Sequence, residues 1–380
     1  MTTWKDQFWK KIELIEVRFD QLKLNIGNRN RSIGELQVIP YRGYCNCKRL
    51  YCRGRVLENP EITPTLKDGK WENFVNVYKR FESDEIPNAH VRLSFDEHTF
   101  DLMTDAEGYY ILNIELPTPS FHKTLWQTLK IELLDAPVPF DGTIVTTGEI
   151  LTPTPDTQIG IISDMDDTVI KTDVVSKTRM LYHTFFKNAY SRLAFRGVAA
   201  FYWALRKGND GEQNNPFFYV SNSPWNLYDL LEEFLDHNDI PKGPIFLRDF
   251  GIHKNEDAIK YKTHKHNEVL RILLSYPSLQ FILIGDSGEK DLDIYLQVVQ
   301  AFPNRIVAIY IRQVEDRKRN ERIMALAEQE TGVPIFLFDN SFEAAKHAAK
   351  HRFITPEWLL KVKHSMDEPR SLMDDWFDED

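Results

Sequence analysis

Residues 159–168 constrain the fold of this chain more strongly than any other segment. An apolar run over residues 159–163 leads directly into Asp164, Asp166 and Thr168. The run predicts a strand, and the carboxyl ends of strands in a parallel α/β sheet are where ligands bind. Two carboxylates placed two residues apart at a strand end repel each other, so they need a cation or a shared proton. The arrangement suits a magnesium ion and a nucleophilic aspartate.

The chain after residue 155 alternates between strands and helices. Pro153 and Pro155 mark an extended linker before this region. Apolar runs then recur, with helical patterns between them, at 159–163, 217–220, 280–284, 306–311 and 335–338. This alternation predicts an α/β fold with a doubly wound parallel sheet. A short final helix is expected at 357–360.

The chain before the linker has two other patterns. Apolar side chains spaced by three and four residues over 3–24 predict an amphipathic helix. Short alternating runs separated by turn signals from residue 35 onward predict a small β-sandwich. The domain boundaries expected from these patterns are an N-terminal helix over 1–34, a β-sandwich over 35–151, an α/β domain over 156–353 with a cap insert over 169–215, and a C-terminal helix with an acidic tail over 354–380.

Composition narrows the class of protein. The formal net charge of −10 argues against general nucleic-acid binding. No apolar run approaches the length of a transmembrane helix, and the first residues carry charges where a signal peptide needs an apolar stretch. We therefore expect a cytoplasmic protein. Cys45, Cys47 and Cys52 have no spacing typical of zinc ligands and are a poor disulfide framework, so we expect free thiols.

Polar groups of fitting types follow two later strands. Ser221 and Asn222 come after the run at 217–220, where a hydroxyl beside backbone N–H groups can hold a phosphate oxygen. Asp286 and Asp291 come after the run at 280–284 and add two carboxylates to the same edge of the sheet.

A lysine near these strands is expected to complete the site. Lys265 opens a predicted helix and can reach back to a phosphate or to a carboxylate. Lys254, Lys260 and Lys262 are the alternatives for the same role.

These pieces, in this order, resemble the four motifs of the haloacid-dehalogenase (HAD) superfamily of phosphotransferases: DxDxT after a strand, a strand ending in serine, a lysine, and GDxxxxD. The segments 219–225, 247–251 and 284–288 more closely resemble the catalytic domain of the actin-patch-protein-type phosphatidate phosphatases and their bacterial relatives. The stretch 40–57 resembles the segment that precedes that domain in such relatives.

The resemblance implies a Mg²⁺ cofactor and a role for each motif residue. Asp164 would be the nucleophile that accepts the phosphoryl group, and Asp166 the general acid and base. Lys265 would offset the negative charge of Asp164 and of the phosphoryl group. The implied catalytic residues are Asp164, Asp166, Ser221 and Lys265. The implied substrate-contacting residues are Ser221, Asn222, Lys265 and Thr168, and the implied metal ligands are Asp164, Asp166, Asp286 and Asp291.

The predicted cap has an unusual composition. Residues 169–208 carry eight basic side chains and one acidic side chain, a net charge of +7 in a chain of −10. The same stretch is rich in aromatic residues. A basic, aromatic, helical cap over a phosphatase site suits an anionic lipid at a membrane surface. The alternative is an ordinary cap helix with an apolar core face and a solvated basic face.

The sequence therefore predicts a Mg²⁺-dependent phosphatidate phosphatase that works through an aspartyl-phosphate, with peripheral membrane contact as one of the two interpretations of its basic cap. A first alternative is a soluble HAD phosphomonoesterase acting on a small metabolite or a phosphoprotein. A second alternative is a non-catalytic lipid- or protein-binding module. The intact pair of Asp164 and Asp166 disfavours this second alternative.

Overall fold

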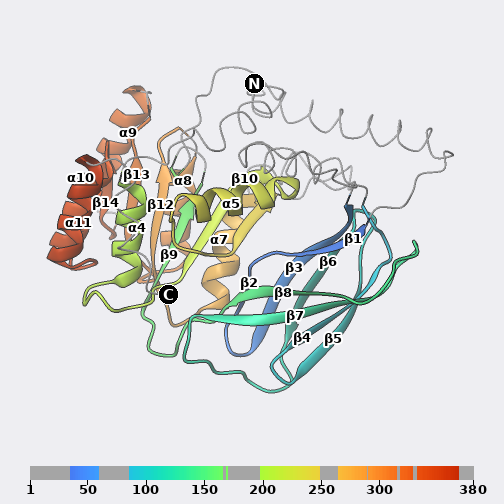
Figure 1. Cartoon of the computed structure of the whole chain (residues 1–380). Coiled ribbons are helices and arrows are strands. Elements are labelled where there is room, and N and C mark those ends of the chain that lie inside the picture. The colour runs from blue at the N-terminus through green and yellow to red at the C-terminus, as the bar shows by residue number, and fades with distance from the viewer. Residues whose placement is uncertain are drawn as a thin grey trace.

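The computed structural model describes residues 35–59, 85–165, 168–169, 197–248, 264–288, 290–314, 317–327 and 332–367. These ranges form a β-domain, residues 35–151, and an α/β domain, residues 159–367 (Figure 1). The helix predicted over 3–24 and the acidic tail lie outside the described residues. Among the helices that are described, none is long and apolar enough to cross a bilayer.

The β-domain contains eight described strands. They are β1 (Glu35–Pro40), β2 (Gly43–Cys45), β3 (Arg49–Asn59), β4 (His90–Phe95), β5 (His98–Met103), β6 (Tyr109–Glu115), β7 (Trp126–Asp135) and β8 (Ile144–Leu151). The strand order is β1-β3-β2-β8-β7-β4-β5, and β6 also pairs with β3. The β2–β8 pair is parallel and the other pairs are antiparallel. The predicted sandwich is thus one continuous mixed sheet.

Alternating side chains build a single core inside this sheet. In β4, Val91, Leu93 and Phe95 are buried while the residues between them are partly exposed. Side chains from β1, β3, β4, β6 and β7 share the same apolar cluster, so the sheet folds over on itself. Cys45 and Cys52 are buried in the domain, Cys47 is half-buried, and none of the three forms a disulfide.

Every apolar strand predicted for the α/β domain is present. The parallel strands are β9 (Ile159–Asp164), β10 (Phe217–Pro224), β11 (Ile245–Arg248), β12 (Gln280–Asp286), β13 (Ile306–Arg312) and β14 (Ile335–Phe338). Their order is β11-β10-β9-β12-β13-β14. The β11 strand was not predicted. The order changes direction between β9 and β12, and such a reversal is where ligands bind in open α/β sheets.

Helices cover both faces of the parallel sheet. One layer holds α4 (Val198–Lys207), α5 (Tyr228–His237), α10 (Ser341–Lys350) and α11 (Pro356–Asp367), and the other holds α7 (His264–Ser275), α8 (Asp291–Ala301) and α9 (Arg317–Ala327). A 3-10 turn, η1 (Trp225–Leu227), joins β10 to α5. Successive residues Ile161 and Ile162 of β9 enter the cores on opposite faces, which explains why that strand is apolar throughout. The predicted final helix is the first turn of α11.

The predicted cap, 169–215, includes a helix that belongs to the sheet. Phe201, Tyr202 and Arg206 of α4 are buried, and α4 packs against α10 and α11. The C-terminal part of the range is therefore part of the α/β layer, and its aromatic residues are explained by core packing. Residues 170–196 lie outside the described residues, so the cap over them remains a prediction.

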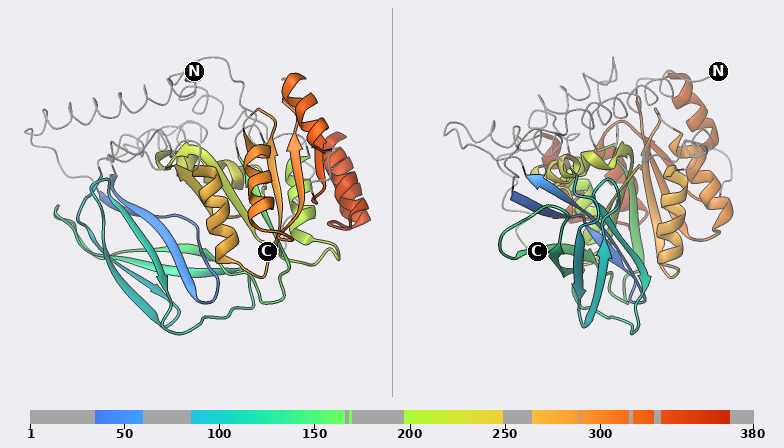
Figure 2. Two further views of the ribbon diagram at one scale, coloured as in Figure 1. Left: turned by 180° about the vertical axis from the view of Figure 1, so that it is seen from behind. Right: turned by 90° about the vertical axis from the view of Figure 1, so that its right-hand side faces the viewer.

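The β-domain packs on the β11 side of the parallel sheet, opposite α10 and α11 (Figure 2). Phe246 of the edge strand β11 lies 5.9 Å from the ring of Tyr44 and 6.3 Å from that of Tyr51, measured between ring centroids. On the other face, the ring of Tyr41 stacks on Tyr228 at 3.9 Å. The two domains thus share an aromatic interface that holds them in one orientation.

Candidate functional site

The two central strands end in aspartates at the point where the strand order reverses. Asp164 is the last residue of β9, and Asp286 is the last residue of β12. The parallel register pairs Ser163 with Ile284, so the two strands reach the carboxyl edge of the sheet together. The structure brings these two aspartates side by side, as their places at strand ends predicted.

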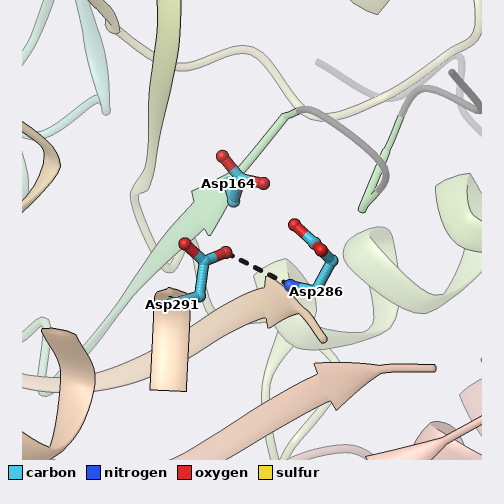
Figure 3. A group of neighbouring side chains, drawn as sticks. All are labelled: Asp164, Asp286 and Asp291. Carbon is cyan, nitrogen blue, oxygen red and sulfur yellow. Dashed lines mark hydrogen bonds between the residues drawn. The ribbon is translucent and has the colours of Figure 1, made fainter. Parts of the chain in front are cut away.

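Asp291, at the start of α8, completes a cluster of three carboxylates. One carboxylate oxygen from each of Asp164, Asp286 and Asp291 lies within 4.8 Å of the other two. Figure 3 shows the three groups approaching one another from β9, β12 and α8. Each residue is at most 1 % exposed. Buried carboxylates this close repel one another, and their hard oxygen atoms fit a cation such as Mg²⁺.

Lys265, in the first turn of α7, brings a positive charge into this cluster. Its Nζ atom lies 2.8 Å from Asp164 Oδ1 and 2.5 Å from Asp291 Oδ1. The lysine side chain is 3 % exposed, so these ion pairs are shielded from water. The ammonium group therefore offsets part of the repulsion among the carboxylates. The alternative lysines, Lys254, Lys260 and Lys262, lie outside the described residues.

The two oxygens of Asp291 both accept hydrogen bonds within the protein. Oδ1 accepts from Lys265 Nζ, and Oδ2 accepts from the backbone N–H of Asp286 at 3.2 Å. Gly285 permits this approach, because a Cβ atom there would lie 2.8 Å from Asp291 Cβ. Asp291 thus connects Lys265 to the end of β12. The close approach of Asp291 also explains why the GDxxxxD motif has a glycine at position 285.

Ser221 reaches the same edge from the neighbouring strand. Val220 of β10 is paired with Asp164, so Ser221 lies one residue beyond the aspartate. The backbone N–H of Ser223 donates to Ser221 Oγ at 2.9 Å, and this hydrogen bond fixes the hydroxyl in the turn. Asn222 is half-buried beside it.

The residues after Asp164 are placed in part. The hydroxyl of Thr168 donates to Asp164 Oδ2 at 3.4 Å, which sets this side chain against the aspartate. Asp166, the predicted acid and base, lies outside the described residues together with Asp167. The roles predicted for all these residues remain predictions, whereas the convergence of Asp164, Asp286, Asp291 and Lys265 is observed.

Two supporting residues on the α4 side of the sheet were not predicted. The hydroxyl of Tyr202 lies 2.7 Å from Ser163 Oγ, which donates to the carbonyl of Asp164 at 2.8 Å. Arg312 ends β13 as the register partner of Asp286, and burial lowers the pKa of its guanidinium to about 10. Neither residue has a sequence signal, because each acts across a long separation in the chain.

The β-domain also reaches the loop that follows Ser221. The guanidinium carbon of Arg53 lies 4.2 Å from the ring centroid of Trp225 and 4.1 Å from that of Tyr109. Stacking of this kind holds an arginine between two ring faces. The loop between β10 and α5 is therefore in contact with both domains.

Part of the chain matches a known catalytic domain. Residues 159–313 match the family model described as phosphatidate phosphatase APP1, catalytic domain, which confirms the resemblance of this segment to the actin-patch-protein-type phosphatidate phosphatases. Phosphatidate phosphatase APP1 of Saccharomyces cerevisiae is 38 % identical over 155 residues, which are 40 % of this chain and 26 % of that protein. An uncharacterized protein of Schizosaccharomyces pombe is 30 % identical over 220 residues, which are 57 % of this chain and 34 % of that protein.

The chain thus spans about a quarter to a third of the length of the curated relatives it matches. Among solved structures, a carbohydrate acetylesterase from Xanthomonas citri aligns with a TM-score of 0.28 and 11 % identity, over 73 % of this chain and 68 % of that chain. A likeness at this level supports no inference about function.

Proposed function

We propose that this protein is a Mg²⁺-dependent phosphatidate phosphatase whose α/β domain has the doubly wound HAD-like fold. The observation that carries the proposal is the buried group formed by Asp164, Asp286, Asp291 and Lys265 at the end of the central strands. This group lies within the segment that matches the phosphatidate phosphatase catalytic domain.

The carboxylates of Asp164 and Asp286 suit one Mg²⁺ ion by donor chemistry and spacing. Their oxygens are hard donors that lie within 4.8 Å of each other and of an oxygen of Asp291, close enough for one small cation to contact both. Asp164 and Asp286 would hold the ion with the backbone carbonyl of Asp166. Since both oxygens of Asp291 already accept hydrogen bonds, its part would be to hold Lys265 and the end of β12 in place. A bound Mg²⁺ neutralises charge on the phosphoryl oxygens.

The reaction would proceed in two phosphoryl transfers. A carboxylate oxygen of Asp164 attacks phosphorus, the bond from phosphorus to the glycerol oxygen breaks, and Asp166 protonates that oxygen as diacylglycerol leaves. Asp166 then takes a proton from water, which attacks the aspartyl-phosphate and releases inorganic phosphate. Ser221, Asn222 and Lys265 would bind the phosphoryl oxygens through both steps.

A soluble phosphomonoesterase remains the second candidate, and α4 favours it. The aromatic residues Phe201 and Tyr202 are 1 % exposed, and Arg206 is 2 % exposed, so part of the basic, aromatic composition of the insert packs inside the protein. Contact with an anionic membrane would then depend on the six basic residues of the insert that precede α4.

Phosphate release from phosphatidate in detergent micelles tests the proposal, measured beside para-nitrophenyl phosphate, with Mg²⁺ and with a chelator. We expect Mg²⁺-dependent release from phosphatidate, and its loss in Asp164→Asn, because an amide cannot accept the phosphoryl group. Asp293→Asn makes the same chemical change outside the site and is the control, since Asp293 lies in the first turn of α8 and forms an ion pair at the surface with Arg322.

Three results would contradict parts of the proposal. Full activity of Asp164→Asn would contradict the assignment of Asp164 as the nucleophile. Full activity after exhaustive chelation would contradict the requirement for Mg²⁺. Hydrolysis of the soluble ester alone, with none of phosphatidate, would favour the soluble phosphomonoesterase.

A further inference from the structure

His264 lies at the junction between the two elements that carry the predicted phosphate ligands. It is the first residue of α7 and precedes Lys265, which binds Asp164. Its ring also hydrogen-bonds to the backbone of Ser221 in β10. A single side chain therefore connects the strand that carries the serine to the helix that carries the lysine.

The surroundings of His264 keep its ring neutral. Burial, together with the positive charge of Arg248, lowers the pKa of the imidazole to about 4. The hydrogen bond to Ser221 favours the charged ring, but its effect on the pKa is smaller than those of burial and of Arg248, and Arg271 and Lys265 make smaller lowering contributions. The groups that face this histidine from β11 and α7 are therefore cationic.

The two ring nitrogens of His264 differ in their surroundings. Nε2 is buried and has no hydrogen-bond partner among the described residues. A neutral imidazole has one N–H donor and one acceptor nitrogen. Since Nε2 has no partner in the described part of the chain, the nitrogen that donates to the Ser221 carbonyl is Nδ1. The ring is then held with Nδ1 toward β10.

We propose that His264 is a positioning residue that holds the phosphate-binding turn of Ser221 in register with Lys265. The proposal rests on the proposed function, because it assigns a purpose to the spacing between two phosphate ligands. The serine lies on β10 and the lysine on α7, and these two residues are 44 positions apart in the chain. The hydrogen bond from Nδ1 fixes the carbonyl of the same residue whose hydroxyl is oriented by Ser223 N–H.

A matched pair of amide substitutions tests which nitrogen matters. In His264→Asn the side-chain NH₂ lies near the position of Nδ1, and in His264→Gln it lies near the position of Nε2. We expect His264→Gln to raise KM for para-nitrophenyl phosphate and Ki for inorganic phosphate about tenfold, the effect of losing one hydrogen bond. His264→Asn should keep both values within about threefold of the parent, and kcat should change less than KM in each variant.

A merely structural role would give a different result. It would lower kcat through loss of folded enzyme, with KM unchanged, and both amide variants would melt at lower temperature to a similar degree. Equal KM and Ki in the parent and in His264→Gln would also overturn the proposal.

The tautomer of His264 provides a readout that does not need activity. In a spectrum of ¹⁵N-labelled histidine side chains at pH 7.5, the resonance that disappears in His264→Asn should be that of a neutral ring protonated at Nδ1. A charged ring, or one protonated at Nε2, would overturn the proposal even in an active enzyme. If the parent hydrolyses no phosphate ester, the proposed function fails, and the tautomer together with the dissociation constant of inorganic phosphate still decides the role of His264.

Discussion

Replacing Lys265 with methionine isolates the charge that the lysine brings to the buried carboxylates. Methionine keeps a long unbranched side chain and removes the ammonium group, whose Nζ lies 2.8 Å from Asp164 and 2.5 Å from Asp291. Removing one partner of a buried ion pair costs about 3–5 kcal/mol, because the remaining charge is left in a low-dielectric site. For a domain of this size, such a loss lowers Tm by roughly 6–20 °C.

Thermal unfolding in the presence of a chelator measures this loss, and Lys242→Met is the matched control. Lys242 Nζ lies 3.0 Å from Glu149 Oε1, a distance like that at Lys265, but the two side chains are 49 % and 40 % exposed. Exposed pairs contribute about 0–1 kcal/mol, so the control should unfold close to the parent. A Tm for Lys265→Met equal to that of Lys242→Met would refute the assigned charge balance.

Adding Mg²⁺ extends the test to the metal site. A cation among the carboxylates would replace the positive charge of the ammonium group that the Lys265→Met variant has lost. Mg²⁺ should therefore raise Tm more in this variant than in the parent. Binding at a concentration 100 times Kd stabilises a folded protein by about 2.7 kcal/mol. No rise in either protein would contradict a metal ion at the carboxylates, and an equal rise in both would show that the ion does not replace the charge of Lys265.

Three further predictions follow from other parts of the molecule. Gly285→Ala should lower kcat at saturating Mg²⁺ at least tenfold and destabilise the fold by about 1–3 kcal/mol, because the new Cβ overlaps the side chain of Asp291; unchanged kinetics would contradict the close approach. Burial raises the pKa of Glu232 from 4.5 to about 7, so the folded state should lose roughly 3 kcal/mol as pH rises between these two values, and Tm scans of Glu232→Gln should lack this part of the pH dependence. A pH profile that is the same in the variant would exclude Glu232 as its source. Reversing charge in the insert with Lys187→Glu and Arg192→Glu should weaken binding to anionic vesicles at low salt by about 1 kcal/mol per residue, with little change toward a soluble ester; equal vesicle binding would remove the support for membrane contact.

Much of the site could be predicted because it is built at strand ends. Asp164 and Asp286 follow apolar runs, and parallel strands bring their carboxyl ends to one edge whatever lies between them in the sequence. Lys265 could be singled out because a helix starts there. These are local signals in the sequence. The parallel arrangement of the strands brings the residues that carry them together at one edge of the sheet.

The remaining features depend on contacts that no local pattern contains. The strand β11 has only three apolar residues before its arginine, a shorter run than the four that predicted β14. The hydroxyl of Tyr202 contacts Ser163, which is 39 residues away in the chain. The sequence predicted a cap helix there because a helix with apolar and basic residues has the same pattern whether it packs on a sheet or covers an active site. The stacking of Arg53 on Trp225 joins two domains, and neither residue has a periodicity that indicates a partner.

The aromatic contact between the β-domain and β11 has a consequence for dividing this chain. The segment that matches the catalytic family, residues 159–313, contains β9 to β13 but neither the β-domain nor β14. Cut at those limits, the sheet would lose its neighbours on both sides, with Phe246 uncovered at β11 and the hydrogen-bonding groups of β13 open to solvent. Bare strands of this kind recruit strands from other molecules. A shortened protein limited to the matched segment should therefore self-associate.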